Sequence, residues 1–283
     1  MTLSSTIRKR GGKRQWFDRM VYVILTILLI ACIFGPVLAP HDPYQVNLDT
    51  KFLSPRPGYW LGTDASGRDI LSRLLVGARG TLVSATLIAL LAAIVGVLVA
   101  AIATTFGKWV DEILMRICDI SLSLPLLVFG LGISVALGPS LQSAIIALVL
   151  AMWPGFARLA RGVMKQTMAE SYVEAARTMG ASRLRIMVRH VLPNSLDVVV
   201  VHTTFDIGGV TLLLAGMSFI GVGAQPPSAE WGAMTSDGRG YIVTAWWASL
   251  APGIAITLSV IAFGLLGDIL QKRMDPSLRM GQR

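Results

Sequence analysis

Long apolar runs alternate with polar stretches along the chain of 283 residues. Each run is close to the ~20 residues that a helix needs to cross a bilayer. Backbone groups inside a bilayer must be paired within the protein, so the pattern predicts an all-α polytopic membrane protein with six transmembrane helices. The predicted spans are residues 20–40, Thr81–Phe106, Ile113–Leu137, Leu141–Ala160, Ser195–Ile220 and Trp246–Leu270.

Composition supports this class and argues against a metal or disulfide framework. Hydrophobic residues make up 54% of the chain and charged residues 14%, whereas an ordinary soluble domain is about a quarter charged. Cys32 and Cys118 lie in or beside apolar runs without metal-ligand spacing, which favours a buried apolar role for both. His41, His190 and His202 fall in three different regions. The sequence therefore predicts no metal site.

The basic residues indicate an orientation in the membrane. The net charge is +9, and a cytoplasmic N terminus places nineteen Lys and Arg residues inside and six outside. This bias follows the positive-inside rule, so the charge does not indicate nucleic-acid binding. We expect cytoplasmic tails at residues 1–19 and 271–283, and a core of five helices over residues 81–270.

The segment 41–80 is predicted to be external. It is rich in proline and turn residues, and Thr63 or Asp64 can cap a helix that follows. One face of this helix is apolar and the other polar, which predicts an amphipathic helix on the membrane surface. The apolar positions are Ile70, Leu71, Leu74 and Leu75, and the polar positions are Arg68, Asp69, Ser72 and Arg73.

A polar cytoplasmic loop, residues 161–193, separates the fourth and fifth predicted spans. Ser171 and Glu174 have the spacing of a capping box, which would start a helix at Tyr172. Gly180 stands where this helix needs a left-handed residue to end.

A second short helix is expected to follow in the same loop. Ser182 can cap it, and it would run toward His190. Pro193 is predicted to end it before the next apolar run. The loop therefore reads as two short helices joined by a hinge.

His202 and Asp206 lie four residues apart in the fifth span and so share one helix face. An ionisable group at membrane depth usually faces the bundle interior or a wet cavity. Both residues can therefore line a solute pathway, where Asp206 would engage a cationic group. Alternatively, Asp206 bonds to His202, to Thr203 or to backbone near Gly208, as packing between helices. We favour packing at this stage.

The sequence contains none of the common catalytic motifs that we considered. The pairs Gly12-Lys13 and Gly107-Lys108 are not followed by Ser or Thr, so no Walker A loop is present. Neither G-x-S-x-G nor H-E-x-x-H occurs, which gives no support for a protease of these types. We therefore expect no catalytic site on this chain, and energy must come from another subunit.

The polar loop carries a long-spaced motif. Glu174-Ala175-Ala176 is followed by three residues, Gly180, nine residues, His190 and then Leu192-Pro193. This resembles the EAA motif of permease subunits of bacterial ATP-binding-cassette importers. The motif normally has Ile where His190 stands, and Arg189 to Asn194 looks like the variant of the dipeptide/oligopeptide/nickel branch.

A second resemblance supports the C-type permease subunits of that branch. It covers about residues 41–278 and includes segments on both sides of the core. These segments are Leu61-Gly62-Thr63-Asp64, Gly67-Arg68-Asp69, Ser72-Arg73, Gly77, Gly223 to Pro227, Glu230 to Met234 and Asp275-Pro276.

The resemblance implies a type I importer permease-like (MetI-like) fold in a bacterial plasma (inner) membrane, with both termini cytoplasmic. It implies partnership with a second homologous permease, two ATP-binding subunits, an extracytoplasmic solute-binding protein and membrane lipid, but no nucleic acid. ATP would be bound by the partner subunits, so no cofactor is expected on this chain. The implied solutes are dipeptides or oligopeptides. A nickel or metal-chelate importer of the same family, and a stand-alone channel or secondary carrier, remain alternatives.

In that family the polar loop docks in a groove of the ATPase, and small or apolar residues suit such a contact. The resemblance implies coupling roles for Tyr172, Val173, Glu174, Ala175, Ala176, Met179, Gly180 and Arg183. Glu174 and Gly180 would mainly shape the loop. Arg183 and neighbouring arginines can pair with acidic groups of a partner.

Overall fold

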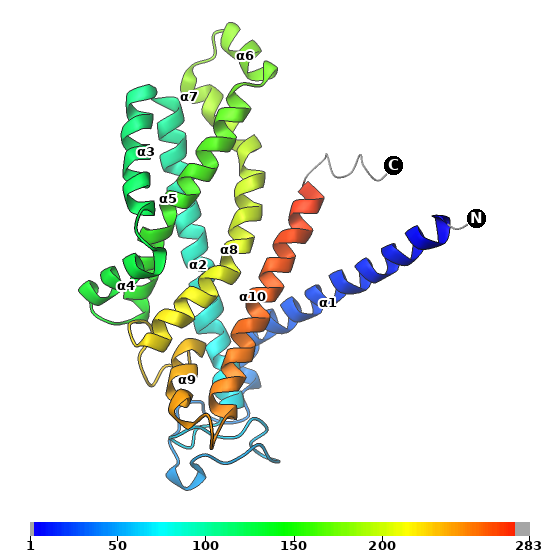
Figure 1. The fold of residues 1–283 in the computed structure, drawn as a ribbon, viewed down its shortest axis with the longest axis vertical. Helices are drawn as coiled ribbons and strands as arrows, with labels where there is room; N and C mark the ends of the chain where they lie inside the picture. Colours follow the sequence, from blue (N-terminus) through cyan, green and yellow to red (C-terminus); the bar gives the residue numbers. More distant parts are fainter. Residues whose placement is uncertain (1–2, 275–283) are drawn as a thin grey trace. The chain divides into compact units, whose positions relative to one another are not determined.

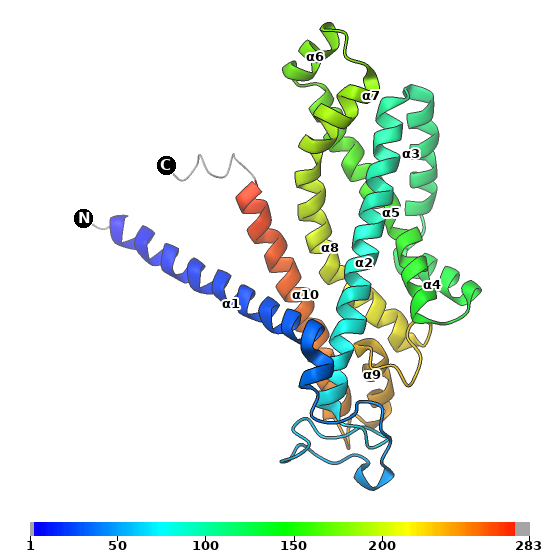
Figure 2. The same cartoon turned by 180° about the vertical axis from the view of Figure 1, so that it is seen from behind.

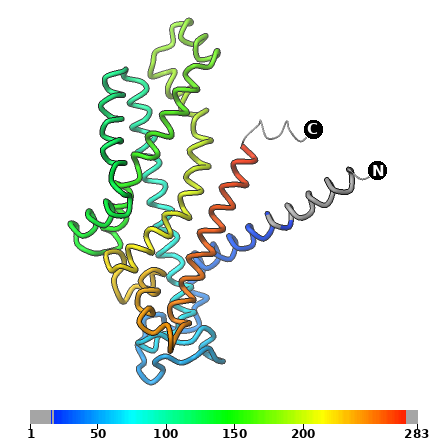
Figure 3. The backbone as a smooth tube through the Cα atoms, in the orientation of Figure 1, coloured from blue at the N-terminus to red at the C-terminus, as the bar shows by residue number. Residues whose placement is uncertain are grey.

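The structure is a computed structural model that describes the backbone of residues 3–274. Side chains are described from Trp16 onward, with the exception of Phe17 (Figure 3). The basic side chains of the predicted N-terminal tail before Trp16, and residues 275–283 of the predicted C-terminal tail, lie outside the described residues. Residues 3–274 form helices and two isolated β-bridges but no strand, which confirms the all-α class.

Five helices are long and apolar enough to cross a membrane, and a bent helix pair raises the number to six if it counts as one span. This agrees with the predicted positions of the spans. The five are α1 (Leu3–Leu38), α2 (Ile70–Thr105), α5 (Leu141–Met168), α8 (Leu192–Ile220) and α10 (Trp247–Met274) (Figure 1). Helix α1 also includes most of the predicted N-terminal tail, and its membrane-spanning part is Asp18–Leu38.

The predicted third span, Ile113–Leu137, is not one continuous helix. It consists of α3 (Lys108–Leu122) and α4 (Leu126–Leu137), which meet at 88°. Pro125 precedes α4 and has ψ 125°. A proline lacks the backbone N–H that a continuing helix needs, and it disfavours helical geometry in the residue before it. The long apolar run concealed this break.

The predicted surface helix in segment 41–80 is also wrong. Residues 70–80 are the first turns of α2, which continues without interruption to Thr105. The side chain of Asp69, rather than Thr63 or Asp64, accepts a hydrogen bond from the backbone N of Ser72 (2.9 Å) at the start of this helix. Its polar side is therefore part of the folded interior, not of a water-facing surface.

By contact, the chain forms two compact units, and α2 contributes to both. The first unit contains residues 1–83 and 226–283, and the second contains residues 84–225. Besides α1, α10 and the start of α2, the first unit has η1 (Leu48–Thr50), α9 (Trp231–Gly238) and η3 (Arg239–Tyr241).

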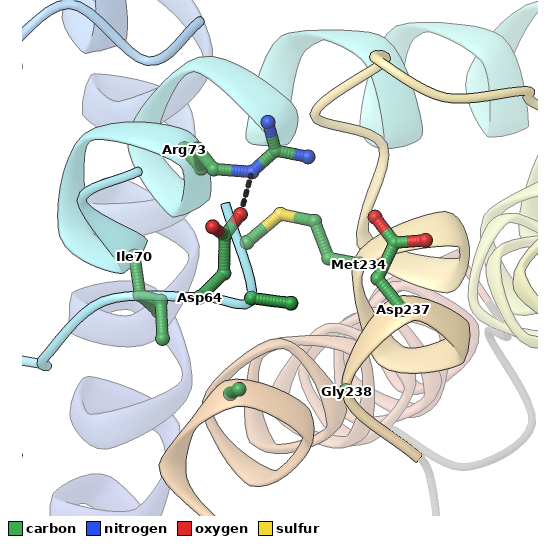
Figure 4. Close-up of a pocket in the computed structure, with 8 residues that line it drawn as sticks. Asp64, Ile70, Arg73, Met234, Asp237 and Gly238 are labelled. Atoms are coloured by element: carbon green, nitrogen blue, oxygen red, sulfur yellow. Dashed lines mark ion pairs between the residues drawn. The ribbon is translucent and has the colours of Figure 1, made fainter. Parts of the chain in front are cut away.

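A buried charge cluster organises the non-helical part of the first unit (Figure 4). The Asp64 carboxylate accepts a hydrogen bond from Arg68 Nε (2.7 Å) and lies 3.6 Å from Arg73 Nε. Arg73 also donates to the carbonyl oxygen of Ser228 (3.1 Å). Asp64, Arg73 and Asp237 line a cavity of about 10 Å³. These pairs explain why the arginines are inside, because a buried charge needs a partner.

Glu230 fixes α9 within the same unit. Its carboxylate accepts hydrogen bonds from the backbone N of Gly232 and of Ala233, each at 3.0 Å. It also accepts from Thr81 Oγ1 at 3.2 Å. An acidic N-cap satisfies free N–H groups and complements the helix dipole. The buried Glu230 therefore joins α9 to α2.

The second unit is built on α2, α5 and α8, with α3 and α4 beside them (Figure 2). One buried cluster includes Ile88, Leu148 and Leu214, and another includes Phe156 and Met164. The short helices α6 (Ser171–Thr178) and α7 (Arg183–Ile186) lie at the end of this unit where α2 is followed by α3 (Figures 1 and 2).

Candidate coupling loop and the helices behind it

The polar loop is more compact than the predicted segment 161–193. Helix α5 continues to Met168, and α6 begins only three residues later. After α6 and α7, residues Met187–Val191 form a π-helical turn that leads directly into α8. The protruding part of the loop is therefore the pair α6–α7, whereas residues 161–168 belong to a long helix.

The predicted capping box at the start of α6 is not formed. Ser171 is already the first helical residue, and the N-cap position is taken by Glu170, whose side chain makes no capping hydrogen bond. A residue inside the helix cannot place its hydroxyl at the N-cap. Glu174 is exposed rather than engaged in a capping box.

The end of α6 is as predicted. Gly180 has φ +83°, in the left-handed region. The backbone N of Ala181 donates to the Ala176 carbonyl (3.1 Å), and that of Gly180 donates to the Arg177 carbonyl (3.0 Å). This pair of bonds is the Schellman motif, which glycine at this position allows without steric strain.

The second helix begins as predicted but does not end as predicted. The Ser182 hydroxyl accepts from the backbone N of Arg185 (3.3 Å), which confirms it as the N-cap of α7. Pro193 does not terminate the helix, because it is the second residue of α8. The π turn at Met187–Val191 adds one residue before the proline. Such a turn relieves the clash and the lost hydrogen bond that proline causes in a regular helix.

Two of the predicted contact residues are buried within the chain itself. Val173 is 0% exposed and Ala176 is 6% exposed. Val173 belongs to the buried cluster that contains Met164, Ile186 and Val191. Their predicted place on an accessible surface is therefore wrong. They hold α6 against the helices behind it, because the apolar face of so short a helix needs tertiary packing.

The opposite face of the loop is exposed and mixes apolar with basic residues. Tyr172, Glu174, Ala175, Met179 and Arg183 are all exposed, as a contact surface requires. Met179 is 82% exposed.

Helix α7 and the π turn add two exposed apolar residues that the sequence analysis missed. Leu184 is 62% exposed and Val188 is 58% exposed. Their spacing of four residues on a helix places them on one face. That spacing was visible in the sequence. We define the coupling surface as Tyr172, Ala175, Met179, Arg183, Leu184 and Val188.

Ion pairs between α3 and α5 support the helix that leads into the loop. Asp111 bonds to Arg161 and, at 2.7 Å, to Lys165 Nζ. Asp119 bonds to Arg158. These pairs could not be found from the sequence, because residues about forty to fifty positions apart give no local signal.

His202 and Asp206 share a face of α8, as predicted. His202 Nε2 lies 3.6 Å from Asp206 Oδ2, and both side chains are partly exposed. Thr203 donates its hydroxyl proton to the Val199 carbonyl (2.7 Å). Thr203 is therefore engaged within its own helix rather than with Asp206. A role of either residue in a solute pathway remains a prediction.

The long apolar helices define a polytopic helical membrane protein. The chain belongs to the family of binding-protein-dependent transport system inner membrane components, which it matches over residues 60–280. Residues 22–55 match the N-terminal TM domain of oligopeptide transport permease C. Both matches confirm the resemblance noted in the sequence.

Curated relatives are permease proteins of transport systems. The chain is 42% identical to a probable D,D-dipeptide transport system permease protein, DdpC, of Escherichia coli (strain K12), over 90% of this chain and 85% of that protein. It is 37% identical to a dipeptide transport system permease protein, DppC, of Alkalihalophilus pseudofirmus, over 91% of this chain and 84% of that protein. It is 35% identical to a glutathione transport system permease protein, GsiD, of Escherichia coli O6:K15:H31, over 95% of this chain and 89% of that protein.

A solved structure shows the same fold. The match is to an inward-facing MetNI methionine ABC transporter, with a TM-score of 0.58 and 20% identity over 71% of this chain and 96% of that chain. A second crystal form of the same transporter gives a TM-score of 0.60. The predicted MetI-like fold is confirmed. The chain is therefore a permease component of an ATP-binding-cassette importer.

Proposed function

We propose that this chain forms part of the translocation path of an importer for dipeptides or oligopeptides. It works with a second homologous permease, two ATP-binding subunits and an extracytoplasmic solute-binding protein. The three relatives described above are named for the transport of D,D-dipeptides, dipeptides and glutathione, which supports the peptide class. Both termini and the α6–α7 loop face the cytoplasm, in accord with the positive-inside distribution.

The coupling surface is the observation that carries the proposal. A loop with apolar residues facing outward and a packed, buried face underneath suits insertion into a groove of another protein. Arg183 is the basic member of this surface and can pair with carboxylates of the partner. A groove that closes when the ATPase subunits close would favour one position of the loop. This differential contact is what biases the helix bundle between its two states.

The chain itself performs no covalent chemistry in this proposal. ATP is bound and hydrolysed on the partner subunits, and no cofactor is held here. Asp206 would contact the cationic amino group that every linear peptide carries, and His202 beside it would tune that contact. An acidic group inside an apolar span suits this role.

ATP-dependent uptake in proteoliposomes tests the function. The complete complex is reconstituted with its binding protein, and entry of a labelled dipeptide and of a Ni²⁺ chelate is measured with and without ATP. We expect dipeptide uptake only with ATP. Preferred uptake of the chelate would assign the metal branch instead, and uptake driven by an ion gradient without ATP would show a secondary carrier. The described residues contain no group of three or more His, Cys, Asp or Glu that could hold a metal ion.

A further inference from the structure

Phe156 lies where α2, α5 and α8 meet in the second unit. It is 1% exposed. On one side it packs against Gly96 of α2, where an added Cβ atom would lie 2.7 Å from the backbone N of Ala157 and 2.8 Å from the carbonyl O of Trp153. The backbones of α2 and α5 therefore approach each other closely at the base of the Phe156 side chain.

On its other side Phe156 contacts His202 of α8. The two ring centroids are 5.4 Å apart and the rings are inclined by 76°, an edge-to-face arrangement. Such pairs have a preferred geometry. His202 is in turn 3.6 Å from Asp206. Phe156 and Asp206 are therefore linked through one side chain, His202.

Phe156 is also connected to the coupling loop. It belongs to the same buried cluster as Val173 under α6 and Met187 in the π turn. The part of helix α5 from Phe156 to its last residue, Met168, is about 18 Å long at 1.5 Å per residue. Helix α6 begins three residues after Met168. Because protein interiors are close-packed, a movement of the loop is passed on to the side chains of this cluster rather than absorbed between them.

We propose that Phe156 is a positioning residue that transmits movement of the α6–α7 loop to His202 and thereby sets the access of a solute to Asp206. The inference rests on the proposed function of the loop. Gly96 of α2 contacts the base of the Phe156 side chain, and His202 of α8 contacts its ring. The loop controls the site through α5 and the buried cluster, in addition to the direct continuation of α7 into α8.

The experiment measures solute imported per ATP hydrolysed by the reconstituted complex. The variants are Phe156→Leu, His202→Leu and the double variant, with Phe106→Leu as the matched control because Phe106 is exposed. We expect each of the first two to lower the ratio about threefold or more, within the range of such couplings. The double variant should be no worse than the more impaired single variant, and the control should match wild type.

Two results would overturn the inference. One is a wild-type ratio in Phe156→Leu, and the other is a double variant whose loss equals the product of the two single losses, since independent sites add in free energy. If Phe156→Leu fails to assemble, the same cycle is made with Val173→Ala and His202→Leu, where multiplying losses again overturn the proposal. Absence of ATP-dependent uptake by the wild-type complex would instead contradict the proposed function.

Discussion

Arginines in two regions of this chain have opposite environments. Arg68 and Arg73 are buried beside Asp64, and Arg73 also bonds to backbone carbonyl groups. Arg183 and Arg185 in the loop are exposed, and among the described residues neither has an ion pair within the chain. A buried pair holds the fold together only while both partners remain, whereas an exposed charge contributes little to stability. The first group is therefore structural, and the second is available to a partner.

Removing a buried arginine should have the largest effect. Arg73→Ala leaves the Asp64 carboxylate without one of its cations and removes the hydrogen bond to Ser228. We expect the unfolding free energy to decrease by about 3–5 kcal/mol. Thermal unfolding of the purified protein in detergent measures this. Arg183→Ala is the control, and an equal loss in both variants would contradict the division between the two groups.

Loss of packing on the buried face of the loop should have the second largest effect. Val173→Ala removes two methyl groups from a fully buried site, at a cost of about 2 kcal/mol that falls mainly on the loop. We expect faster cleavage between α6 and α7 by an added protease. Ala175→Gly at an exposed position of the same helix provides the comparison. Equal protection of Val173→Ala and wild type would show that this packing does not hold the loop.

Reversing the exposed charges should weaken a partner contact and leave the fold intact. Arg183→Glu with Arg185→Glu should lower the affinity for the ATPase subunits about tenfold or more, because like charges then face each other. Binding is measured at two salt concentrations, and the wild-type contact should weaken at high salt. Wild-type affinity in the variant would show that Arg183 and Arg185 do not contact the ATPase subunits. A lowered unfolding temperature would show that they support the fold.

Straining the backbone at the end of α6 should lower the free energy of unfolding less than the changes above. Gly180→Ala places a Cβ atom on a residue with φ +83°, and beyond the adjoining residues of the chain nothing lies within 4 Å of it. Only the backbone conformation is penalised, by about 1 kcal/mol. Thermal unfolding should show this loss, and Gly209→Ala is a helical control without a positive φ. An unchanged unfolding temperature would contradict the need for glycine at the end of α6.

The smallest expected effect concerns pH. Burial raises the pKa of Asp237, and the nearby Arg68 and Arg73 offset part of this shift. Since the folded pKa exceeds the unfolded value of about 3.9, the neutral acid is favoured in the folded state. Its contribution to stability is complete at lower pH and decreases as pH rises through the folded pKa. Asp237→Asn should therefore lose less stability than wild type between pH 4 and 7 in thermal unfolding. An identical pH profile would contradict this.

Features with a local cause could be predicted from the sequence. The spans followed from apolar length, and Gly180 and Ser182 were found from the chemistry of helix ends. The break at Pro125 has a local cause too, but the apolar run around it favoured one helix. Pro193 gave the opposite error: it was predicted to end a helix, but a π turn before it allows the helix to continue.

Features that depend on distant partners could not be predicted. The polar side of residues 68–73 looked like a water-facing surface, because its partner Asp237 is more than 160 positions away. Val173 and Ala176 looked like contact residues because small and apolar side chains suit either an interface or a core. Only tertiary packing distinguishes the two.

Cross-linking of the coupling surface tests its role most directly. In a background with Cys32 and Cys118 replaced by Ala, Met179→Cys and Val173→Cys are each assembled with the ATPase subunits and treated with a short thiol–amine cross-linker. Met179→Cys should cross-link to an ATPase subunit, with a yield that changes when ATP is bound, and Val173→Cys should not. Cross-linking of Val173→Cys without any at Met179→Cys, in complexes that still transport, would show that the ATPase contacts a different face of the loop.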